Sequence, residues 1–222
     1  MTTFIFIRHA HSLGNQMGFC SGHMDYPLVE KGHAQAKRLA EHLRATYPID
    51  AIYASNLIRT IQTAQPTAEA FGLEVQMDPR FCEVCLGEWE GQTWKAVEEQ
   101  DPELSNSWLS MRMRRSDRRP RGSECMEEVW ERVGAAVKEI VADHRGSCVA
   151  VFCHGRMMRA FSTLWAEQDA DAAQILADKA PRGFFGASIT VAEFNDDGSF
   201  AKLLLCNDRE YMMDKDARVA VE

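Results

Sequence analysis

Short apolar segments alternate along this chain with longer segments that carry apolar residues at helical spacing. The strand-like segments lie at 3–8, 49–55, 73–78 and 147–155. Segments in which apolar residues recur every three or four positions, and which therefore predict helices, lie at 30–47, 56–72, 124–143 and 156–168. Strands that alternate with helices predict a mainly parallel sheet with helices on both faces.

The last predicted elements form a hairpin. "ASITVAEF" at 187–194 and "SFAKLLLC" at 199–206 flank "NDDG", which is a turn signal. Within the helical series, Ser55 is the expected N-cap of the helix at 56–72, and Gly72 is its expected stop.

Residues 79–123 interrupt the alternation, because they hold little periodic pattern. A loop of that length in a compact domain is usually functional or has structure of its own. We therefore expect one domain over residues 1–222, with 79–123 inserted as a lid over the sheet edge. The arginine-rich run Arg112–Arg121 is expected to be a solvated face rather than a substrate contact.

The charge balance excludes several partners. The chain carries 33 acidic and 25 basic residues, for a net charge of -8. Without a basic excess to neutralise phosphates, we expect neither nucleic acid nor an anionic membrane as a partner.

The N-terminus lacks the features of a signal peptide, and no stretch approaches the roughly 18 apolar residues of a spanning helix. The seven cysteines then indicate reduced thiols in a cytoplasmic protein.

Charged and imidazole side chains gather where predicted strands end. Arg8 and His9 end the first strand, Ser55 and Arg59 follow the second, and His154 ends the strand at 147–155. Ligands bind outside the carboxyl ends of the strands in such sheets, so these groups are expected to converge. They could be structural polar groups, ligands of a metal, or a nucleophile with its phosphate clamp.

A metal site is the weakest of these hypotheses. His9 and His11 form a His-x-His pair of the kind found in barrel metallohydrolases. Such barrels usually run to about 250 residues or more and need further ligands at later strand ends. Only His154 is so placed, and we expect neither a metal nor another cofactor.

Phosphoryl transfer fits these residue types better. Arginine forks bind phosphate oxygens, and positive charge at that place stabilises the transition state. A neutral histidine can attack phosphorus and form a covalent phosphohistidine. The leaving alkoxide then needs a proton, so a carboxylic acid should lie nearby.

Five stretches carry a resemblance to a known family. They are "RHAHSLGN", "GHMDYPLVEKGHAQA", "YASNLIRTIQTA", "CEVCLGEWEG" and "FCHG". In this order and spacing they resemble the histidine phosphatase superfamily, in its phosphoglycerate-mutase-like branch, from Phe4 to about Asn207. The resemblance implies a three-layer α/β/α sandwich with a mostly parallel central sheet and an inserted lid.

The resemblance also implies roles for individual residues. His9 matches the nucleophile, and Glu83 matches the proton donor, with Glu88 and Glu90 as rivals for that role. The residues implied to hold the phosphoryl group or the substrate are Arg8, Asn15, Arg59, His154, His11 and Gly22. Of these, Arg8, Arg59 and His154 also count as catalytic.

The chain departs from the family pattern at several positions. Ala10 stands where glycine is usual, which a negative φ would allow. His11 replaces a glutamate or glutamine and is expected either at the rim of the pocket or facing solvent. "PRGSE" at 120–124 exchanges the last two residue types of the family's lid motif, and Ser123 is the expected N-cap of the next helix, with Glu127 near the capping-box position.

The histidine that often follows "CND" is missing. Cys82 and Cys85 flank Glu83 and are expected to pack the loop rather than to bind zinc.

Three functions follow from this reading. A phosphomonoesterase acting on a small phosphorylated metabolite is favoured, because the stretch after the acid resembles the phosphatase members. A phosphoglycerate mutase is the alternative, and a non-catalytic phospholigand-binding module is the third. Trp89, Trp94 and Trp108 would suit a polyanionic or partly apolar phosphoester if they line the lid. A homodimer is a base-rate expectation only.

Overall fold

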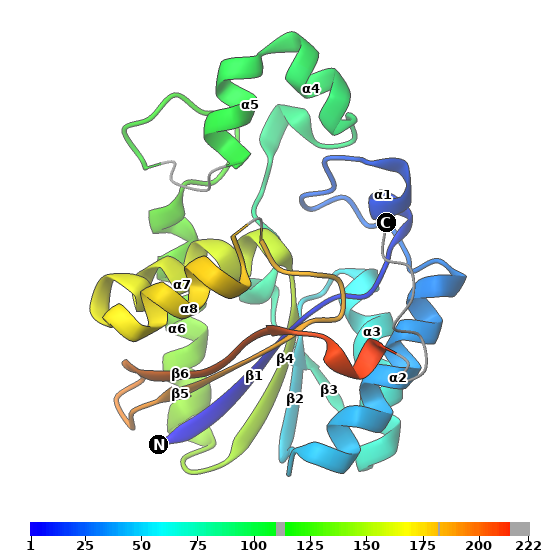
Figure 1. Ribbon diagram of the computed structural model, residues 1–222, viewed down its shortest axis with the longest axis vertical. Coiled ribbons are helices and arrows are strands. Elements are labelled where there is room, and N and C mark those ends of the chain that lie inside the picture. Colours follow the sequence, from blue (N-terminus) through cyan, green and yellow to red (C-terminus); the bar gives the residue numbers. More distant parts are fainter. Residues whose placement is uncertain (110–113, 182, 214–222) are drawn as a thin grey trace.

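A six-stranded sheet forms the centre of the computed structural model, which describes residues 1–109, 114–181 and 183–213 (Figure 1). The strands are β1 (Thr2–Arg8), β2 (Ala51–Ala54), β3 (Val75–Met77), β4 (Cys148–Cys153), β5 (Ile189–Phe194) and β6 (Phe200–Asp208). They lie in the order β3-β2-β4-β1-β5-β6, with the first four parallel and the hairpin β5–β6 antiparallel. The predicted parallel sheet and the predicted hairpin are both confirmed.

Strand β1 is buried on both faces. Its side chains alternate, so Phe4 and Phe6 enter one hydrophobic core while Ile5 and Ile7 enter the other. This explains why the strand is a continuous apolar run rather than an alternation of apolar and polar residues. Its neighbours are β4 on one side and β5 on the other, and Arg8 therefore ends the strand in the middle of the sheet.

Helices cover both faces of the sheet, which confirms the three-layer fold. On one face, α2 (Glu30–Thr46) and α3 (Ile58–Phe71) share a core with Ile5 and Ile7. On the other, α6 (Met126–Asp143), α7 (Gly155–Gln168) and α8 (Ala170–Lys179) share a core with Phe4 and Phe6. Helix α8 was not predicted. Within the described part of the chain, no helix combines the length and apolar character needed to cross a bilayer.

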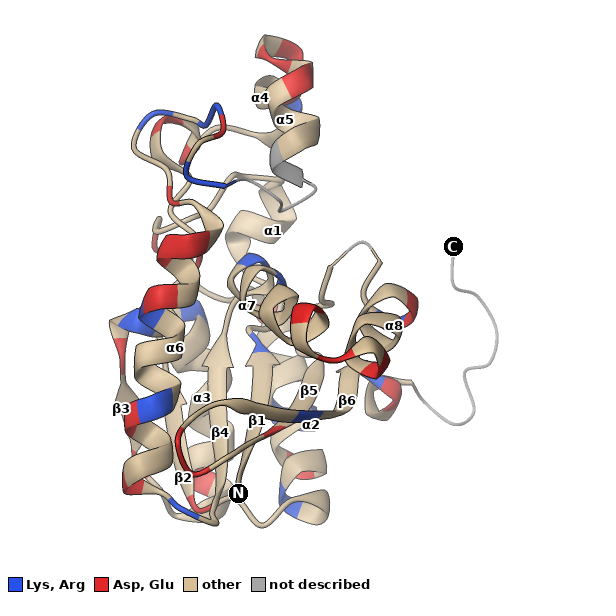
Figure 2. Ribbon diagram, turned by 90° about the vertical axis from the view of Figure 1, so that its left-hand side faces the viewer, with Lys and Arg blue, Asp and Glu red and all other residues tan. Residues whose placement is uncertain are grey.

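The segment 79–123 contains helices that the sequence pattern did not predict. They are the 3₁₀ turns η1 (Pro79–Phe81) and η2 (Gly87–Trp89) and the helices α4 (Trp94–Gln100) and α5 (Pro102–Leu109). Figures 1 and 2 place α4 and α5 beyond the edge at which β1 and β4 end, near the short helix α1 (Leu13–Met17). The insertion therefore rises over the carboxyl ends of the strands.

Two predicted helix caps are wrong. Helix α3 begins after Leu57, whose apolar side chain cannot cap it, while the Ser55 hydroxyl contacts Nε2 of His154 and accepts from the backbone N–H of Leu57. Helix α6 begins after Cys125, with Glu128 completing the capping box, whereas Ser123 lies in a β-bridge with Leu86. The expected stop of α3 is confirmed, since Gly72 is its left-handed C-cap.

Candidate active site

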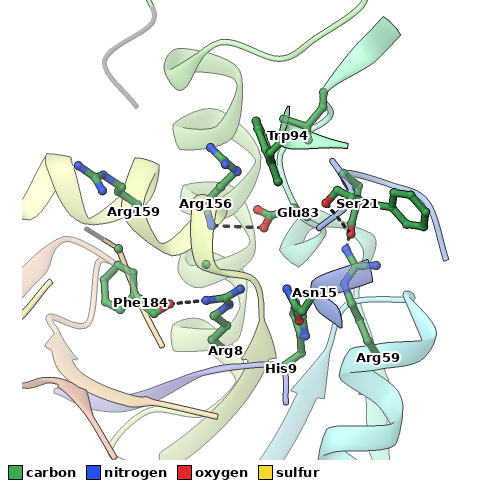
Figure 3. A pocket seen from close by; sticks show the side chains of 15 residues that line it. Arg8, His9, Asn15, Ser21, Arg59, Glu83, Trp94, Arg156, Arg159 and Phe184 are labelled. Carbon is green, nitrogen blue, oxygen red and sulfur yellow. Dashed lines mark hydrogen bonds between the residues drawn. The ribbon is translucent and has the colours of Figure 1, made fainter. Parts of the chain in front are cut away.

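A cavity of about 190 Å³ opens at the carboxyl ends of β1 and β4, below the lid (Figure 3). Its size is below the range of about 300–1,000 Å³ that is typical of sites for drug-sized ligands, so a small ligand fits it best. The lining residues are Arg8, His9, Asn15, Phe19, Ser21, Gly22, Arg59, Glu83, Leu86, Trp94, Gly155, Arg156, Arg159, Gly183 and Phe184.

His9 lies at the floor of this cavity, directly after β1, with only 4% of its surface exposed. Its Nδ1 lies 2.7 Å from the carbonyl oxygen of Ala10. A carbonyl only accepts, so we assign the ring proton to Nδ1, which leaves the lone pair on Nε2. Burial first, and then the charges of Arg59 and Arg8, hold the pKa of His9 well below 6.5. The neutral, nucleophilic form therefore prevails at neutral pH.

Arg8 faces the cavity beside His9 (Figure 3). Its Nη1 donates to the carbonyl oxygen of Phe184, which fixes the side chain. Its Nε is buried and has no hydrogen-bond partner among the residues that the structure describes. Gly155 makes room for it, because a Cβ at that position would lie 3.0 Å from this Nε. A buried donor of this kind is well suited to an anionic ligand.

Arg59 reaches the other side of the cavity from the first turn of α3. Its guanidinium donates to two loop carbonyls, those of Met24 and Gly22, at 2.8 Å each. Gly22 has a φ of +43°, and a Cβ there would lie 2.2 Å from the Glu90 carboxylate. Glycine is therefore needed at this position for the loop to approach both Arg59 and Glu90.

His154 is fully buried behind Arg59 and does not line the cavity. Its Nδ1 accepts from Nε of Arg59 at 3.3 Å, and its Nε2 lies 2.8 Å from the hydroxyl of Ser55. Since Arg59 only donates, the proton sits on Nε2 and points to Ser55. Burial, followed by the charges of Arg59 and His9, holds the pKa of His154 well below 6.5. This neutral histidine orients Arg59.

Glu83 forms the wall opposite His9 and caps the amino end of α7 (Figure 3). Its Oε1 accepts from the backbone N–H groups of Met157 and Val84 at 2.9 Å each, and its Oε2 accepts from that of Arg156 at 3.3 Å. Its backbone carbonyl accepts from Nε2 of His23 at 2.8 Å, which ties this loop to the loop that holds Arg59.

The rival carboxylates have other contacts, and neither of them lines the cavity. Glu90 accepts from the backbone N–H groups of His23 and Leu86, at 3.0 and 2.9 Å. Glu88 accepts from the backbone N–H of Arg121 at 3.1 Å and pairs with its guanidinium. Both residues therefore hold loops together.

Asn15 and His11 differ in their position relative to the cavity, since only Asn15 lines it. Asn15 lines the cavity from α1, and its Oδ1 accepts from the backbone N–H and the hydroxyl of Ser12. His11 lies outside the lining, and its backbone N–H donates to the Gln35 side chain at 2.9 Å. Ala10 is fully buried and does not have a positive φ, which agrees with the expectation for this departure from the family pattern.

The described part of the arginine-rich run lies near acidic residues of the lid and α6 (Figure 2). Arg115 pairs with Glu131 at 3.2 Å, and Arg119 pairs with Glu128 at 3.6 Å. The described residues of the run, 114–121, do not line the cavity. Arg112 and the side chain of Trp108 lie outside the described residues. Trp89 is buried in the core, whereas Trp94 lines the cavity.

The two cysteines beside Glu83 contact different groups. Cys82 donates to the Asn56 side chain at 2.7 Å, and Cys85 donates to the Gly122 carbonyl at 3.4 Å. Each thiol thus fixes a separate part of the loop.

Sequence reasoning missed two basic residues of the site, Arg156 and Arg159. Both lie on the first turns of α7, three positions apart and on the same face of the helix. The sequence could have indicated them, because both follow His154 closely, at the start of a helix that begins where a strand ends.

The chain is similar to known proteins over most of its length. Residues 4–208 match the sequence model of the histidine phosphatase superfamily (branch 1). Phosphoserine phosphatase 1 of Hydrogenobacter thermophilus is 36% identical over 160 residues, which is 72% of this chain and 74% of that protein. The metal-independent phosphoserine phosphatase of Arabidopsis thaliana is 31% identical over 162 residues, 72% of this chain and 67% of that protein. The solved structure of the mycobacterial glucosyl-3-phosphoglycerate phosphatase Rv2419c with VO3 superimposes with a TM-score of 0.78 at 25% identity, covering 93% of this chain and 99% of that one.

Proposed function

The chain belongs to branch 1 of the histidine phosphatase superfamily, and we propose that it hydrolyses its substrate through a phosphohistidine on His9. It is a metal-independent phosphomonoesterase that acts on small phosphorylated metabolites. The observation that supports the role of His9 is its buried, neutral ring, which lies between Arg8 and Arg59 in Figure 3.

The first step is an in-line displacement. Nε2 of His9 forms a bond to phosphorus, and the bond from phosphorus to the ester oxygen breaks. The leaving oxygen takes a proton from Glu83 on the opposite wall, so the acid is required in its protonated form. The phosphorylated ring carries a positive charge, and its Nδ1–H continues to donate to the Ala10 carbonyl.

The second step reverses these roles. Water attacks the phosphohistidine and gives a proton to the Glu83 carboxylate, and the bond from phosphorus to Nε2 breaks. Inorganic phosphate leaves, and both groups return to their starting states. In both steps Arg8 and Arg59 spread positive charge over the phosphoryl oxygens, while His154 and the 22–24 loop keep Arg59 in place.

Trapping the intermediate tests the nucleophile. A phosphohistidine is stable in alkali and labile in acid, so wild-type protein quenched during turnover of a ³²P-labelled phosphomonoester should carry alkali-stable, acid-labile label. His9→Ala should carry none and should release no phosphate. His33→Ala, which changes an exposed histidine on α2, should label as the wild type does. Label or turnover in His9→Ala would remove the assignment.

Product analysis separates the phosphatase from the mutase alternative. A phosphatase releases inorganic phosphate from p-nitrophenyl phosphate and from phospho-metabolites, and EDTA leaves this activity intact. A mutase interconverts 2- and 3-phosphoglycerate after priming by a bisphosphate. A binding module does neither.

Two narrower expectations stay predictions. A cytoplasmic location is tested by fractionation of cells that produce the protein. A homodimer is tested by light scattering on the purified chain, in which a single 25.1 kDa species would contradict it.

A further inference from the structure

The loop that carries Glu83, residues 80–85, is attached to helix α6 through the backbone of the acid itself. The Glu83 carboxylate accepts from N–H groups at the start of α7, whereas its carbonyl oxygen accepts from Nη2 of Arg132 at 3.3 Å. Arg132 belongs to α6 and is not among the residues that line the cavity. It has no part in the two reaction steps, so its place beside the acid needs an explanation of its own.

Arg132 uses all three nitrogens of its guanidinium. Nε and Nη2 donate to the two carboxylate oxygens of Glu124, at 2.8 and 3.0 Å. Nη1 donates to the backbone carbonyl of Arg80 at 2.6 Å, and Nη2 is shared with that of Glu83. A planar guanidinium that is paired in this way is held in one orientation, and the ammonium of a lysine could not replace it.

Glu124 connects the same ion pair to the other end of the loop. Its Oε2 accepts from the backbone N–H of Cys85 at 2.8 Å, and its own backbone N–H donates to the Cys85 carbonyl at 3.0 Å. The pair therefore contacts the loop before, at and after Glu83. Since residues 83–85 belong to no helix or strand, these contacts help to fix their backbone.

The pair between Arg132 and Glu124 is largely shielded from water. The two side chains are 18% and 19% exposed. A shielded, bidentate pair is screened less than an exposed one, so it can hold a fixed geometry. A general acid depends on such geometry, because it must lie within hydrogen-bond reach of the oxygen that it protonates.

We propose that Arg132, paired with Glu124, is a positioning residue for the proton donor Glu83. It acts through the Glu83 carbonyl and does not touch the substrate, so its loss should slow the step that needs the proton more than it weakens phosphate binding. The phosphoryl group is held by arginines of other elements, Arg8 in β1 and Arg59 in α3. This inference rests on the proposed function, because it concerns the acid of that same site.

Esters with different leaving groups test this role. We expect Arg132→Met to lower kcat/KM about tenfold for an alkyl phosphate such as glycerol 3-phosphate, and less than about threefold for p-nitrophenyl phosphate, whose leaving group needs little protonation. The Ki of inorganic phosphate, which reports on Arg8 and Arg59, should change by less than about threefold. Equal losses for the two esters would indicate a merely structural role and would overturn the inference, as would no loss for either.

A matched control separates this contact from the general attachment of the loop to α6. Glu139, two turns further along α6, pairs with the Arg80 side chain at 2.7 Å, so it ties the same loop to the same helix three residues before Glu83. Glu139→Gln should keep the wild-type ratio of kcat/KM between the two esters. A change of that ratio as large as in Arg132→Met would contradict a specific role for Arg132.

A second background shows whether Arg132 acts through Glu83. In Glu83→Gln no acid remains to be positioned, so adding Arg132→Met should lower kcat/KM for the alkyl phosphate by less than about threefold. A further tenfold loss would mean that Arg132 acts on another group, and the inference would fall. Failure of the proposed function looks different, since Glu83→Gln would then not discriminate between the esters, or the wild type would hydrolyse neither.

Urea unfolding shows whether Arg132→Met is folded. If it is not, Glu124→Gln decides, because it removes one charge of the pair but keeps the length of the side chain and an acceptor for the Cys85 N–H. This variant should change the ratio between the two esters by at least about threefold, in the same direction. An unchanged ratio in folded Glu124→Gln would overturn the inference.

Discussion

A single hydrogen bond, from Nδ1 of His9 to the Ala10 carbonyl, leaves the lone pair of the ring on Nε2, which is the nitrogen that attacks phosphorus in the proposed mechanism. The second buried histidine, His154, has a different task, since it accepts from Arg59 and donates to Ser55. The two residues share a residue type and a buried environment, and they differ in their hydrogen-bond partners and in that only His9 lines the cavity, which separates the proposed nucleophile from the proposed positioning group.

Glu83→Gln should separate substrates by their leaving groups. The glutamine oxygen still accepts from the N–H groups of Val84 and Met157, but no acid remains to protonate the leaving oxygen. We expect kcat/KM to fall about 100-fold or more for an alkyl phosphate, and less than about tenfold for p-nitrophenyl phosphate, whose leaving group needs little protonation. Glu88→Gln, a carboxylate outside the cavity, should leave both values near wild type. Equal losses for the two substrates in Glu83→Gln would point to another donor.

The two buried histidines predict how stability depends on pH. Their pKa values are depressed in the folded protein, chiefly by burial, and return to about 6.5 on unfolding. Below that pH the unfolded chain binds protons that the folded chain does not, so their contribution to stability is complete above about pH 7 and falls as the pH drops below 6.5. The slope is up to about 1.4 kcal/mol per pH unit for each histidine.

Urea unfolding between pH 7.5 and pH 5.5 measures this effect. His9→Asn should lose less stability over that interval than the wild type, because one of the two groups is gone. His33→Asn, which changes an exposed histidine, should follow the wild type. The same pH dependence in His9→Asn and wild type would contradict the depressed pKa of His9.

At the scale of elements, helix α2 approaches the segment after β1 so closely that a side chain at Gly32 would clash with it. A Cβ on Gly32 would lie 2.1 Å from the carbonyl oxygen of His11, two residues after His9. Gly134 in α6 provides a matched control, because a Cβ there would meet no atom within 4 Å. The same substitution should therefore have opposite effects at these two helix positions.

Gly32→Ala should destabilise the protein by about 1–3 kcal/mol, as an overpacked contact does. Gly134→Ala should stabilise it by about 0.5–1 kcal/mol, because alanine loses less backbone entropy in a helix. Urea unfolding of both variants measures the difference. Stabilisation by Gly32→Ala would mean that α2 does not approach the loop this closely.

The elements that the sequence predicted are those whose pattern is local. Strand β1 and helix α2 follow from apolar periodicity, and the convergence of Arg8, Arg59 and His154 follows from the rule for parallel strand ends. The predictions of helix caps were wrong because the actual contacts involve residues that are distant in the sequence. The Ser55 hydroxyl, for example, contacts His154, which lies 99 residues further along the chain. Whether Arg156 faces the cavity depends on how α7 is rotated against the sheet, which periodicity alone does not determine.

At the scale of the whole molecule, charge is distributed unevenly. The chain has a net charge of -8, yet four arginines are among the described residues that line its cavity. The basic residues at 114–121 do not add to this positive site, because they pair with acidic residues of α6 and the lid (Figure 2). We therefore expect the arginines of the cavity to attract a phosphoester anion.

The ion pairs of the lid predict a local response to salt. Exposed pairs contribute about 0–1 kcal/mol each, and the Debye length falls from about 10 Å at 0.1 M salt to about 3 Å at 1 M. We expect amide hydrogen exchange at 114–121 to rise about fivefold between these conditions, which corresponds to a total loss of about 1 kcal/mol. Exchange in β4, whose residues are buried, serves as the internal control. A salt-independent rate at 114–121 would show that these pairs do not hold the lid.

The central position of β1 also has a consequence for how the chain is synthesised. This strand leaves the ribosome before the other five, but its two partners, β4 and β5, begin only at residues 148 and 189. Its Phe-Ile-Phe-Ile run therefore has no native neighbour strand until β4 has been synthesised, and we expect it to be exposed to chaperones during that time. Arg8 likewise receives its carbonyl partner from Phe184. We therefore expect a chain truncated before β4 to be inactive and prone to aggregate, because it lacks both neighbours of β1 and the carbonyl that holds Arg8.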